Sequence, residues 1–441
     1  MKLPYITAPQ NKRSKLLAKN VAASFILKGW SAIVVLSMVP LTLKMLGIYQ
    51  NGVWLTISSI LIWVDLLDIG LSNGLRNMVA QFVAQGEKEK VKETVASAFF
   101  MLTIIMIPAI LISAVLIWSL NIYNILGVDV EKVHSLELII FTAFVLTASS
   151  FVLKATGTFF MGLQLPAFNH LFVAIGQTLS LILTFTAYIA GIRSLFVVVL
   201  INTAAPLITW MITVPYTFHV KYPEYRPTLK HISLKMSRSL CSVGFQFFTI
   251  QICGVILFLS SNIIISKLLS PAEVTPYQVA YRYFNIAFIV FSTICMPFWN
   301  ATTDAYTRGD KQWIHKSSRL LDCITLGLLV VILLMLILSK FVYSIWIGNN
   351  VEMPWELSVS VACYVSVLTI SQRYSFILNG LNILKIQIIF TVFAAVIFLP
   401  LAYYVCETYK TVTSLAWVMC LVNTPGLIAN AWKYHKVVIN R

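Results

Sequence analysis

Charge is scarce in this chain of 441 residues. Asp, Glu, Lys and Arg make up only 11% of it, whereas soluble domains carry roughly 25% of these residues. Hydrophobic residues account for 59%. This composition excludes an ordinary soluble globular protein and indicates an integral membrane protein.

The sequence also lacks the common catalytic motifs. It contains no G-x-x-x-x-G-K-[ST] phosphate loop, no H-E-x-x-H zinc motif and no G-x-S-x-G nucleophile motif. The seven cysteines show no C-x-x-C spacing, so neither a disulfide framework nor a zinc site is indicated. The longest outer loop, near 121–135, is too short to form a catalytic domain. We therefore expect a protein that is not an enzyme and that needs no metal and no cofactor.

Long apolar runs recur along the whole chain, each near the ~20 residues that a helix needs to cross the hydrocarbon core. The strands of a membrane barrel would instead alternate apolar and polar residues over ~10 positions. The sequence therefore predicts an all-α integral membrane fold with twelve transmembrane helices. We place them at 20–46, 52–76, 95–120, 136–160, 167–190, 194–218, 239–269, 276–303, 320–346, 355–379, 386–406 and 412–432.

The net charge of +16 follows the predicted topology. Twelve spans divide the connecting segments between two sides, and 25 of the 32 lysines and arginines fall on the side of the N-terminus. Six lie on the other side, and Arg282 lies within a span. The positive-inside rule then places both termini in the cytoplasm. Because the basic residues are explained by topology, we expect no binding to nucleic acid.

An internal repeat predicts two lobes. The two halves of the chain align at a nearly constant offset, which brings equivalent loop motifs together. The aligned pairs are Lys44 with Lys267, Trp54 with Tyr277, Asn77 with Asn300, Gly86 with Gly309, Lys88 with Lys311 and Gly162 with Gly380. We expect a six-helix lobe at 1–218 with a cytoplasmic N-terminal arm, a basic cytoplasmic linker at 219–238 and a second six-helix lobe at 239–441. Parallel repeats of this kind are typical of transporters with a cavity between two bundles.

Polar residues gather in the second half of the second span, in the stretch WVDLLDIGLSNGLR at 63–76. In one continuous helix, an arc of about 80° would hold Asp65, Asp68, Ser72 and Arg76. Gly70 and Gly74 would lie on the opposite face and admit a neighbouring helix. Asp65 would lie ~16 Å deeper than Arg76 and would have to face protein or water. For Asp68 and Arg76, a position at the membrane interface is an alternative.

A second polar stripe follows the eighth span. Within roughly 100° of one another would lie Gln278, Arg282, Asn285, Thr293, Asn300, Thr303 and Asp304. Arg282 is near the outer end, so its guanidinium either snorkels to the interface or faces a cavity and meets an anionic group. Positive potential near the cytoplasmic mouth could also come from Lys28, Lys154, Arg373 and Lys385.

The first part of the chain resembles a known family. Asn51-Gly-Val-Trp54 is similar to its outer Y/N-G-x-W segment, and Asp68-Ile-Gly-Leu-Ser-Asn-Gly-Leu-Arg76 to its D-x-G-x-x-N-G-[LR]-R stretch. Gly162-Leu-Gln164 also looks like the turn between its fourth and fifth spans. These are features of O-antigen (Wzx-type) oligosaccharide flippases, within the multidrug/oligosaccharidyl-lipid/polysaccharide (MOP) exporter superfamily. The motifs fall in the first half of the chain, and the two-lobe layout covers the whole of it.

The resemblance implies a MATE-like pair of pseudo-symmetric six-helix lobes around a central cavity. It implies translocation of undecaprenyl-diphosphate-linked oligosaccharide across the bacterial plasma membrane by alternating access. Amide and carboxylate groups would meet sugar hydroxyls, and arginine or lysine would meet the diphosphate. The residues expected in the cavity are Arg282, Asp65, Asp68, Asn73, Arg76, Asn285, Asp304, Lys28, Lys154 and Arg373. Candidate partners besides the lipid bilayer are a polysaccharide polymerase and chain-length proteins, and a proton or sodium gradient is a candidate energy source.

Two other functions remain open at this point. One is a small-molecule or multidrug exporter of the same superfamily, driven by cation exchange through a carboxylate such as Asp65. The other is an integral-membrane sugar polymerase or ligase. The position of the acidic groups toward the cytoplasmic end of the second span disfavours the exporter, and the short outer loops disfavour the enzyme.

Overall fold

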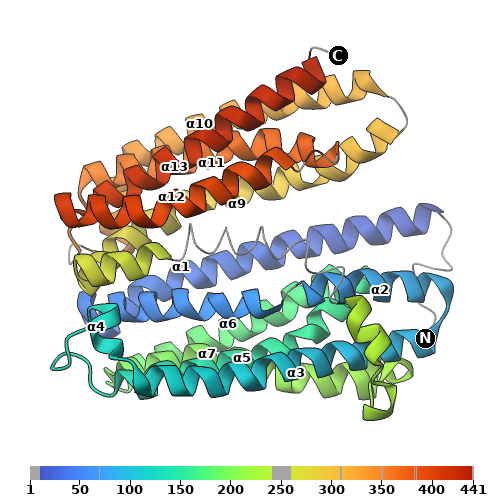
Figure 1. Cartoon of the computed structure of the whole chain (residues 1–441), viewed down its shortest axis with the longest axis horizontal. Helices are drawn as coiled ribbons and strands as arrows, with labels where there is room; N and C mark the ends of the chain where they lie inside the picture. Colours follow the sequence, from blue (N-terminus) through green and yellow to red (C-terminus); the bar gives the residue numbers. More distant parts are fainter. Residues whose placement is uncertain are drawn as a thin grey trace. The chain divides into compact units, whose positions relative to one another are not determined.

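The computed structural model describes residues 10–68, 70–240, 260–307, 310–348, 351–381, 383 and 385–439. Across these residues the chain is helical and forms no strand (Figure 1). This confirms the all-α prediction.

The chain divides into two compact units. The first contains the chain up to Gly47, Ile57–Ile125, and the segment from Asp129 through the basic linker. The second contains the remainder of the described chain, together with Ile48–Thr56 and Leu126–Val128. Short pieces of the first half of the sequence thus belong to the second unit.

In the first unit, α3, α5, α6 and α7 lie side by side, and α2 packs against α3 and α5 (Figure 1). The elements that begin in the first half of the sequence are α1 (Gln10–Ile62), η1 (Trp63–Asp68), α2 (Leu71–Gln85), α3 (Lys88–Ser119), α4 (Ile122–Leu126), α5 (Leu136–Gly162), α6 (Pro166–Ile189) and α7 (Leu195–Pro215). The linker then forms η2 (Tyr216–Lys221), η3 (Pro223–Tyr225) and η4 (Leu229–His231).

In the second unit, α11 packs against α9, α10 and α13, and α12 packs against α13 (Figure 1). Its elements are α9 (Pro271–Thr307), α10 (Lys311–Trp346), α11 (Trp355–Gly380), α12 (Lys385–Tyr409), α13 (Val412–Tyr434) and η5 (His435–Ile439). Within the predicted seventh span, residues 241–259 lie outside the described chain.

Nine helices of the described chain are long and apolar enough to cross a membrane. The most hydropathic, α3 and α10, contain 32 and 36 residues. These helices make the chain a multi-pass membrane protein, while the total of twelve spans stays a prediction.

The prediction of one continuous helix over 52–76 is wrong. The α-helix ends at Ile62 and is followed by a 3₁₀ segment, Trp63–Asp68. Gly70 then takes a left-handed backbone conformation with φ of 75° before α2 begins. A 3₁₀ helix turns every three residues and a left-handed residue reverses the twist, so Asp68 and Arg76 do not follow one helical stripe.

Helix ends recur at positions that the sequence repeat aligns. Helix α3 begins at Lys88, and α10 begins at the equivalent Lys311. Helix α5 ends at Gly162, and α11 ends at the equivalent Gly380. One helix start and one helix end therefore coincide between the two halves, and the full six-helix repeat stays a prediction.

Candidate functional site

Asp68 caps a helix. Its side chain is 5% exposed, and its carboxylate accepts hydrogen bonds from the backbone N–H of Ser72 at 3.0 Å and from the Ser72 hydroxyl at 2.9 Å. The first amides of α2 have no partner within the helix, and a negative charge there is favoured by the helix dipole. Because the helix is interrupted at 63–70, the side chain of Asp68 can cap the start of α2, which it could not do within a continuous helix.

The glycines of the motif segments allow close backbone approach. A Cβ atom on Gly74 would lie 2.9 Å from the backbone oxygen of Leu240. One on Gly52 would lie 1.6 Å from the backbone oxygen of Pro271, at the start of α9. The prediction that Gly74 serves packing is confirmed, whereas Gly70 serves as a left-handed turn.

Asn51 belongs to the same contact in the second unit. Its side-chain amide donates to the hydroxyl of Thr275 at 3.3 Å, and that hydroxyl donates to the backbone oxygen of Ile48 at 3.0 Å. The Asn-Gly pair at 51–52 therefore fixes a short piece of α1 against the first turns of α9.

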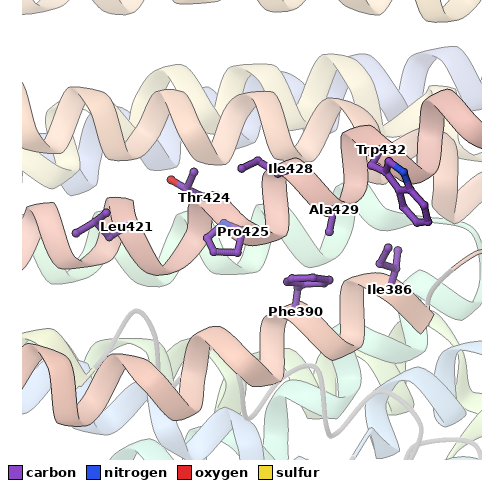
Figure 2. A pocket seen from close by; sticks show the side chains of 8 residues that line it. All are labelled: Ile386, Phe390, Leu421, Thr424, Pro425, Ile428, Ala429 and Trp432. Carbon is purple, nitrogen blue, oxygen red and sulfur yellow. The ribbon is translucent and has the colours of Figure 1, made fainter.

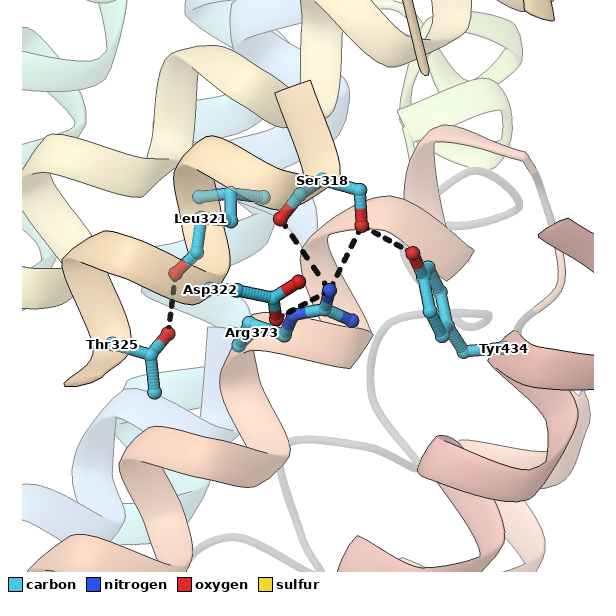
Figure 3. A network of polar contacts seen from close by, with 6 residues as sticks. All are labelled: Ser318, Leu321, Asp322, Thr325, Arg373 and Tyr434. Carbon is cyan, nitrogen blue, oxygen red and sulfur yellow. Dashed lines mark hydrogen bonds and ion pairs between the residues drawn. The ribbon is translucent and has the colours of Figure 1, made fainter. Parts of the chain in front are cut away.

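Arg373 lies in a polar network that joins α10, α11 and α13 (Figure 3). Its side chain is 3% exposed, and its Nη2 atom lies 2.6 Å from a carboxylate oxygen of Asp322. The same nitrogen donates to the hydroxyl of Ser318 at 2.8 Å, and that hydroxyl contacts the hydroxyl of Tyr434. The rings of Tyr374 and Tyr434 lie 4.4 and 4.3 Å from the guanidinium carbon.

The carboxylate of Asp322 neutralises the charge of Arg373, which the sequence had suggested for a cavity. Figure 3 shows the guanidinium of Arg373 directed between Asp322 and Ser318 of α10 and Tyr434 of α13. These partners were not predicted from the sequence. The helical spacing of Ser318 and Asp322 was a signal, but nothing in the sequence pairs them with Arg373.

Arg282 is the contrasting case. It lies half-buried on α9, and its guanidinium makes no hydrogen bond or ion pair with any residue that the structure describes. Its neighbours in the helix are engaged. Tyr283 donates to the backbone oxygen of Met335 at 3.0 Å, and the ring of Tyr281 stacks on Tyr364 of α11 at 6.4 Å.

Polar groups accompany Arg282 along α9. Gln278, one turn before it, donates to the side-chain oxygen of Asn262 at 2.7 Å. Asn262 in turn donates to the backbone oxygen of Leu55 at 3.3 Å. Asn285, on the next turn after Arg282, is half-buried. Asn262 was missed from the sequence, because a lone asparagine in an apolar run has no periodic partner.

The remaining predicted residues are not brought together by any described contact. Three are exposed on helices of the first unit: Lys28 on α1, Arg76 on α2 and Lys154 on α5. Three have side chains outside the described part of the chain: Asp65, Asn73 and Asp304. No group of His, Cys, Asp or Glu side chains that could hold a metal ion occurs in the described chain.

An apolar groove lies between α12 and α13 (Figure 2). It has a volume of about 630 Å³ and is lined by Ile386, Phe390, Leu421, Thr424, Pro425, Ile428, Ala429 and Trp432. Only the hydroxyl of Thr424 and the indole N–H of Trp432 are polar among these side chains, so this groove offers no charged group for a phosphate and few hydrogen-bond partners for a sugar. The polar face of α9 is therefore the better candidate for a substrate site.

Comparison with known proteins places the chain in a polysaccharide biosynthesis family. The sequence pattern of the family described as "Polysaccharide biosynthesis protein" matches residues 17–298. The chain belongs to this family. Two curated relatives, from Salmonella typhimurium and Salmonella typhi, each carry the name "Putative O-antigen transporter". They are 20% and 22% identical over 370 and 382 residues, covering 82% and 83% of this chain and 83% of each relative.

Solved structures support the fold of this family member. An inward-facing multidrug-resistance MATE transporter of the MOP superfamily superposes with a TM-score of 0.75 at 14% identity, covering 92% of this chain and 95% of that one. A MOP-superfamily transporter from Pyrococcus furiosus gives a TM-score of 0.68 at 13% identity, covering 100% and 98%. The fold is therefore that of MATE-like transporters of the MOP superfamily, as the sequence motifs implied.

Proposed function

We propose that this chain is a flippase that moves undecaprenyl-diphosphate-linked oligosaccharide across the bacterial plasma membrane by alternating access. Membership of the polysaccharide biosynthesis family and the names of the two Salmonella relatives support a polysaccharide transporter. The proposal adds the lipid-linked form of the substrate, the inner-membrane location and the mechanism. Transport would need no covalent chemistry, and an ion gradient would supply the driving force.

The charge of Arg282, which has no partner among the described residues, carries this proposal. A buried or half-buried cation without a partner costs several kcal/mol, because the surrounding protein and lipid cannot replace its hydration. Arg373, by contrast, is a buried guanidinium that has the carboxylate of Asp322 beside it. Arg282 is left without such a carboxylate among the described residues. A diphosphate would supply the missing anion, and the planar guanidinium can fork onto two of its oxygens.

The groups beside Arg282 suit the rest of the substrate. Amides such as that of Asn285 both donate and accept hydrogen bonds, as sugar hydroxyls do. Few such groups are present, which favours binding weak enough for release on the other side. We propose that the polyprenyl chain stays in the bilayer throughout.

The test is the display of surface polysaccharide by cells that depend on variants of this chain. At matched protein abundance, Arg282→Ala and Arg282→Gln should abolish display, and Arg282→Lys should restore it only in part. The ammonium of lysine keeps the positive charge but lacks the planar pair of N–H donors with which a guanidinium binds two phosphate oxygens. The control is Arg193→Ala, because that exposed guanidinium stacks 4.1 Å from the ring of Tyr188 and is not on α9. Wild-type display from Arg282→Gln would refute a diphosphate contact and leave Arg282 as an interfacial anchor.

A further inference from the structure

The basic segment between the two halves of the chain, residues 219–238, packs against helices of the first unit. Tyr222 and Tyr225 are buried, and both rings lie 5.9 Å from the ring of Phe159. Farther along, the backbone N–H of Ser233 donates to the hydroxyl of Ser97 at 3.0 Å. These contacts give the segment a defined position on the first unit.

Its contacts with α3 show where it lies relative to the apolar part of that helix. Glu93 is the last charged residue of α3, and positions 94–119 carry no charge. Ser97 lies one helical turn beyond Glu93, or ~6 Å into the apolar part at about 1.5 Å per residue. Glu89, which lies 3.5 Å from the Nε2 atom of His231, is the same distance on the polar side.

The charged residues of α3 end at Glu93, so we take this level as the boundary between headgroups and hydrocarbon. The segment contacts α3 on both sides of it, because the side chain of His231 reaches Glu89 and the backbone of Ser233 lies beside Ser97. The interfacial layer on each side of a bilayer is only about 5–7 Å thick, so these contacts place the segment at that layer.

Two large apolar side chains are exposed on either side of residues 231–233. Leu229 is 85% exposed and Leu234 is 78% exposed. In water such exposed leucines would favour aggregation, but at the edge of the hydrocarbon each can insert among lipid chains. They alternate with exposed cations, because Lys230 and Lys235 directly follow them in the sequence.

The charge of this segment is predominantly positive. Arg226, Lys230, Lys235 and Arg238 are exposed and form no ion pair with any described residue. Glu224 is the one acidic residue between 219 and 240, and it is only half-exposed. Basic residues at a membrane surface attract anionic headgroups, whereas zwitterionic headgroups give them no net attraction.

We propose that residues 226–238 form a docking surface for anionic phospholipids, with Leu229 and Leu234 inserted beside the lipid chains and the flanking lysines and arginines on the headgroups. This role is separate from transport of the saccharide substrate. The surface would fix the height of the first unit in the bilayer and select the lipids around it.

The test places the photoreactive residue p-benzoylphenylalanine at position 229 of the full chain, in nanodiscs with equal parts of phosphatidylglycerol and phosphatidylcholine. After irradiation, peptide adducts should contain phosphatidylglycerol in excess. Each neutralised lysine, in Lys230→Gln and Lys235→Gln, should lower the ratio of the two adducts about fivefold, as expected for a cation near a charged surface.

The matched control changes two exposed lysines of the second unit, Lys311→Gln and Lys316→Gln, which should leave the adduct ratio at position 229 unchanged. A second probe at position 234 covers the case in which substitution at 229 disturbs the segment. Adducts to protein alone at both positions would overturn the proposal. So would a ratio that does not respond to the loss of Lys230 and Lys235.

Discussion

Arg282 and Arg373 lie in the second unit and differ in what surrounds them. Arg373 meets Asp322 at 2.6 Å, two tyrosine rings and a serine hydroxyl. Arg282 meets no described acceptor. The guanidinium of Arg373 therefore connects three helices, whereas the guanidinium of Arg282 is a candidate to bind the substrate. Environment, and not residue type, distinguishes the two roles.

At the residue scale we predict an asymmetry within the ion pair. Asp322→Ala should lower the free energy of unfolding by about 3 kcal/mol, because it leaves the buried guanidinium of Arg373 without its carboxylate. Arg373→Met should cost less, because the side chain of Asp322 is 57% exposed and can be hydrated once its partner is gone. Methionine also fills the space of the arginine stem.

Thermal unfolding of the detergent-solubilised variants measures this asymmetry. A larger drop in Tm for Arg373→Met than for Asp322→Ala would contradict the assignment of a structural ion pair. The network also has an energetic cost, since Nε and Nη1 of Arg373 are buried and find no hydrogen-bond partner in the described part of the chain.

At the scale of elements, the family motifs specify helix contacts. Asn51 and Gly52 bring a piece of α1 onto α9, and Asp68 and Gly70 start α2 after the 3₁₀ turn. Gly74 lets α2 approach Leu240. The residues that most resemble the flippase family therefore maintain the fold, and a motif match alone is a weak guide to substrate contacts.

We predict that Gly52→Ala sharply lowers the amount of folded protein in membranes. Its Cβ atom would overlap the backbone oxygen of Pro271, which cannot move aside as a flexible side chain could. Gly74→Leu should also reduce accumulation, because even its Cβ atom is close to Leu240.

The matched control is Gly327→Ala on α10, where an added Cβ atom meets nothing within 4 Å. It should accumulate normally or better, since alanine favours helix over glycine by about 1 kcal/mol. Quantitative immunoblots of membrane fractions compare the three variants. Equal accumulation of Gly52→Ala and Gly327→Ala would show that the contact with Pro271 is not required.

At the scale of the whole molecule, the distribution of charge predicts the orientation in the membrane. Basic residues are concentrated in the N-terminal arm, in 76–92, in 221–238, in 308–319 and at the C-terminus. Translocation of these segments would oppose the charge bias that orients membrane proteins. Both termini and the 219–238 linker are therefore predicted to lie in the cytoplasm.

Reporter fusions after Arg441 and within 219–238 test this orientation. An alkaline phosphatase fusion should be inactive at both positions and active in the outer loop near 121–135. An active fusion after Arg441 together with an inactive fusion within 219–238 would require an odd number of spans between these positions and would refute the twelve-span topology, and activity of both fusions would refute the cytoplasmic orientation.

The sequence by itself determined the class of protein, the approximate bounds of most helices and the family. These properties depend on local composition, because a run of about twenty apolar residues inserts as a helix largely regardless of its neighbours. Helix ends at Gly162 and Gly380 also follow from local turn residues and from the repeat.

Only the tertiary structure decided what the polar residues do. The stripe over 63–76 assumed an unbroken helix, and the 3₁₀ turn and left-handed Gly70 removed it. The carboxylate that pairs with Arg373 comes from a different helix, and Gly52 meets Pro271 from the opposite half of the sequence. Such pairings depend on which helices lie side by side. A charge is neutralised or left for a ligand by that packing, and hydrophobic periodicity along one chain does not encode it.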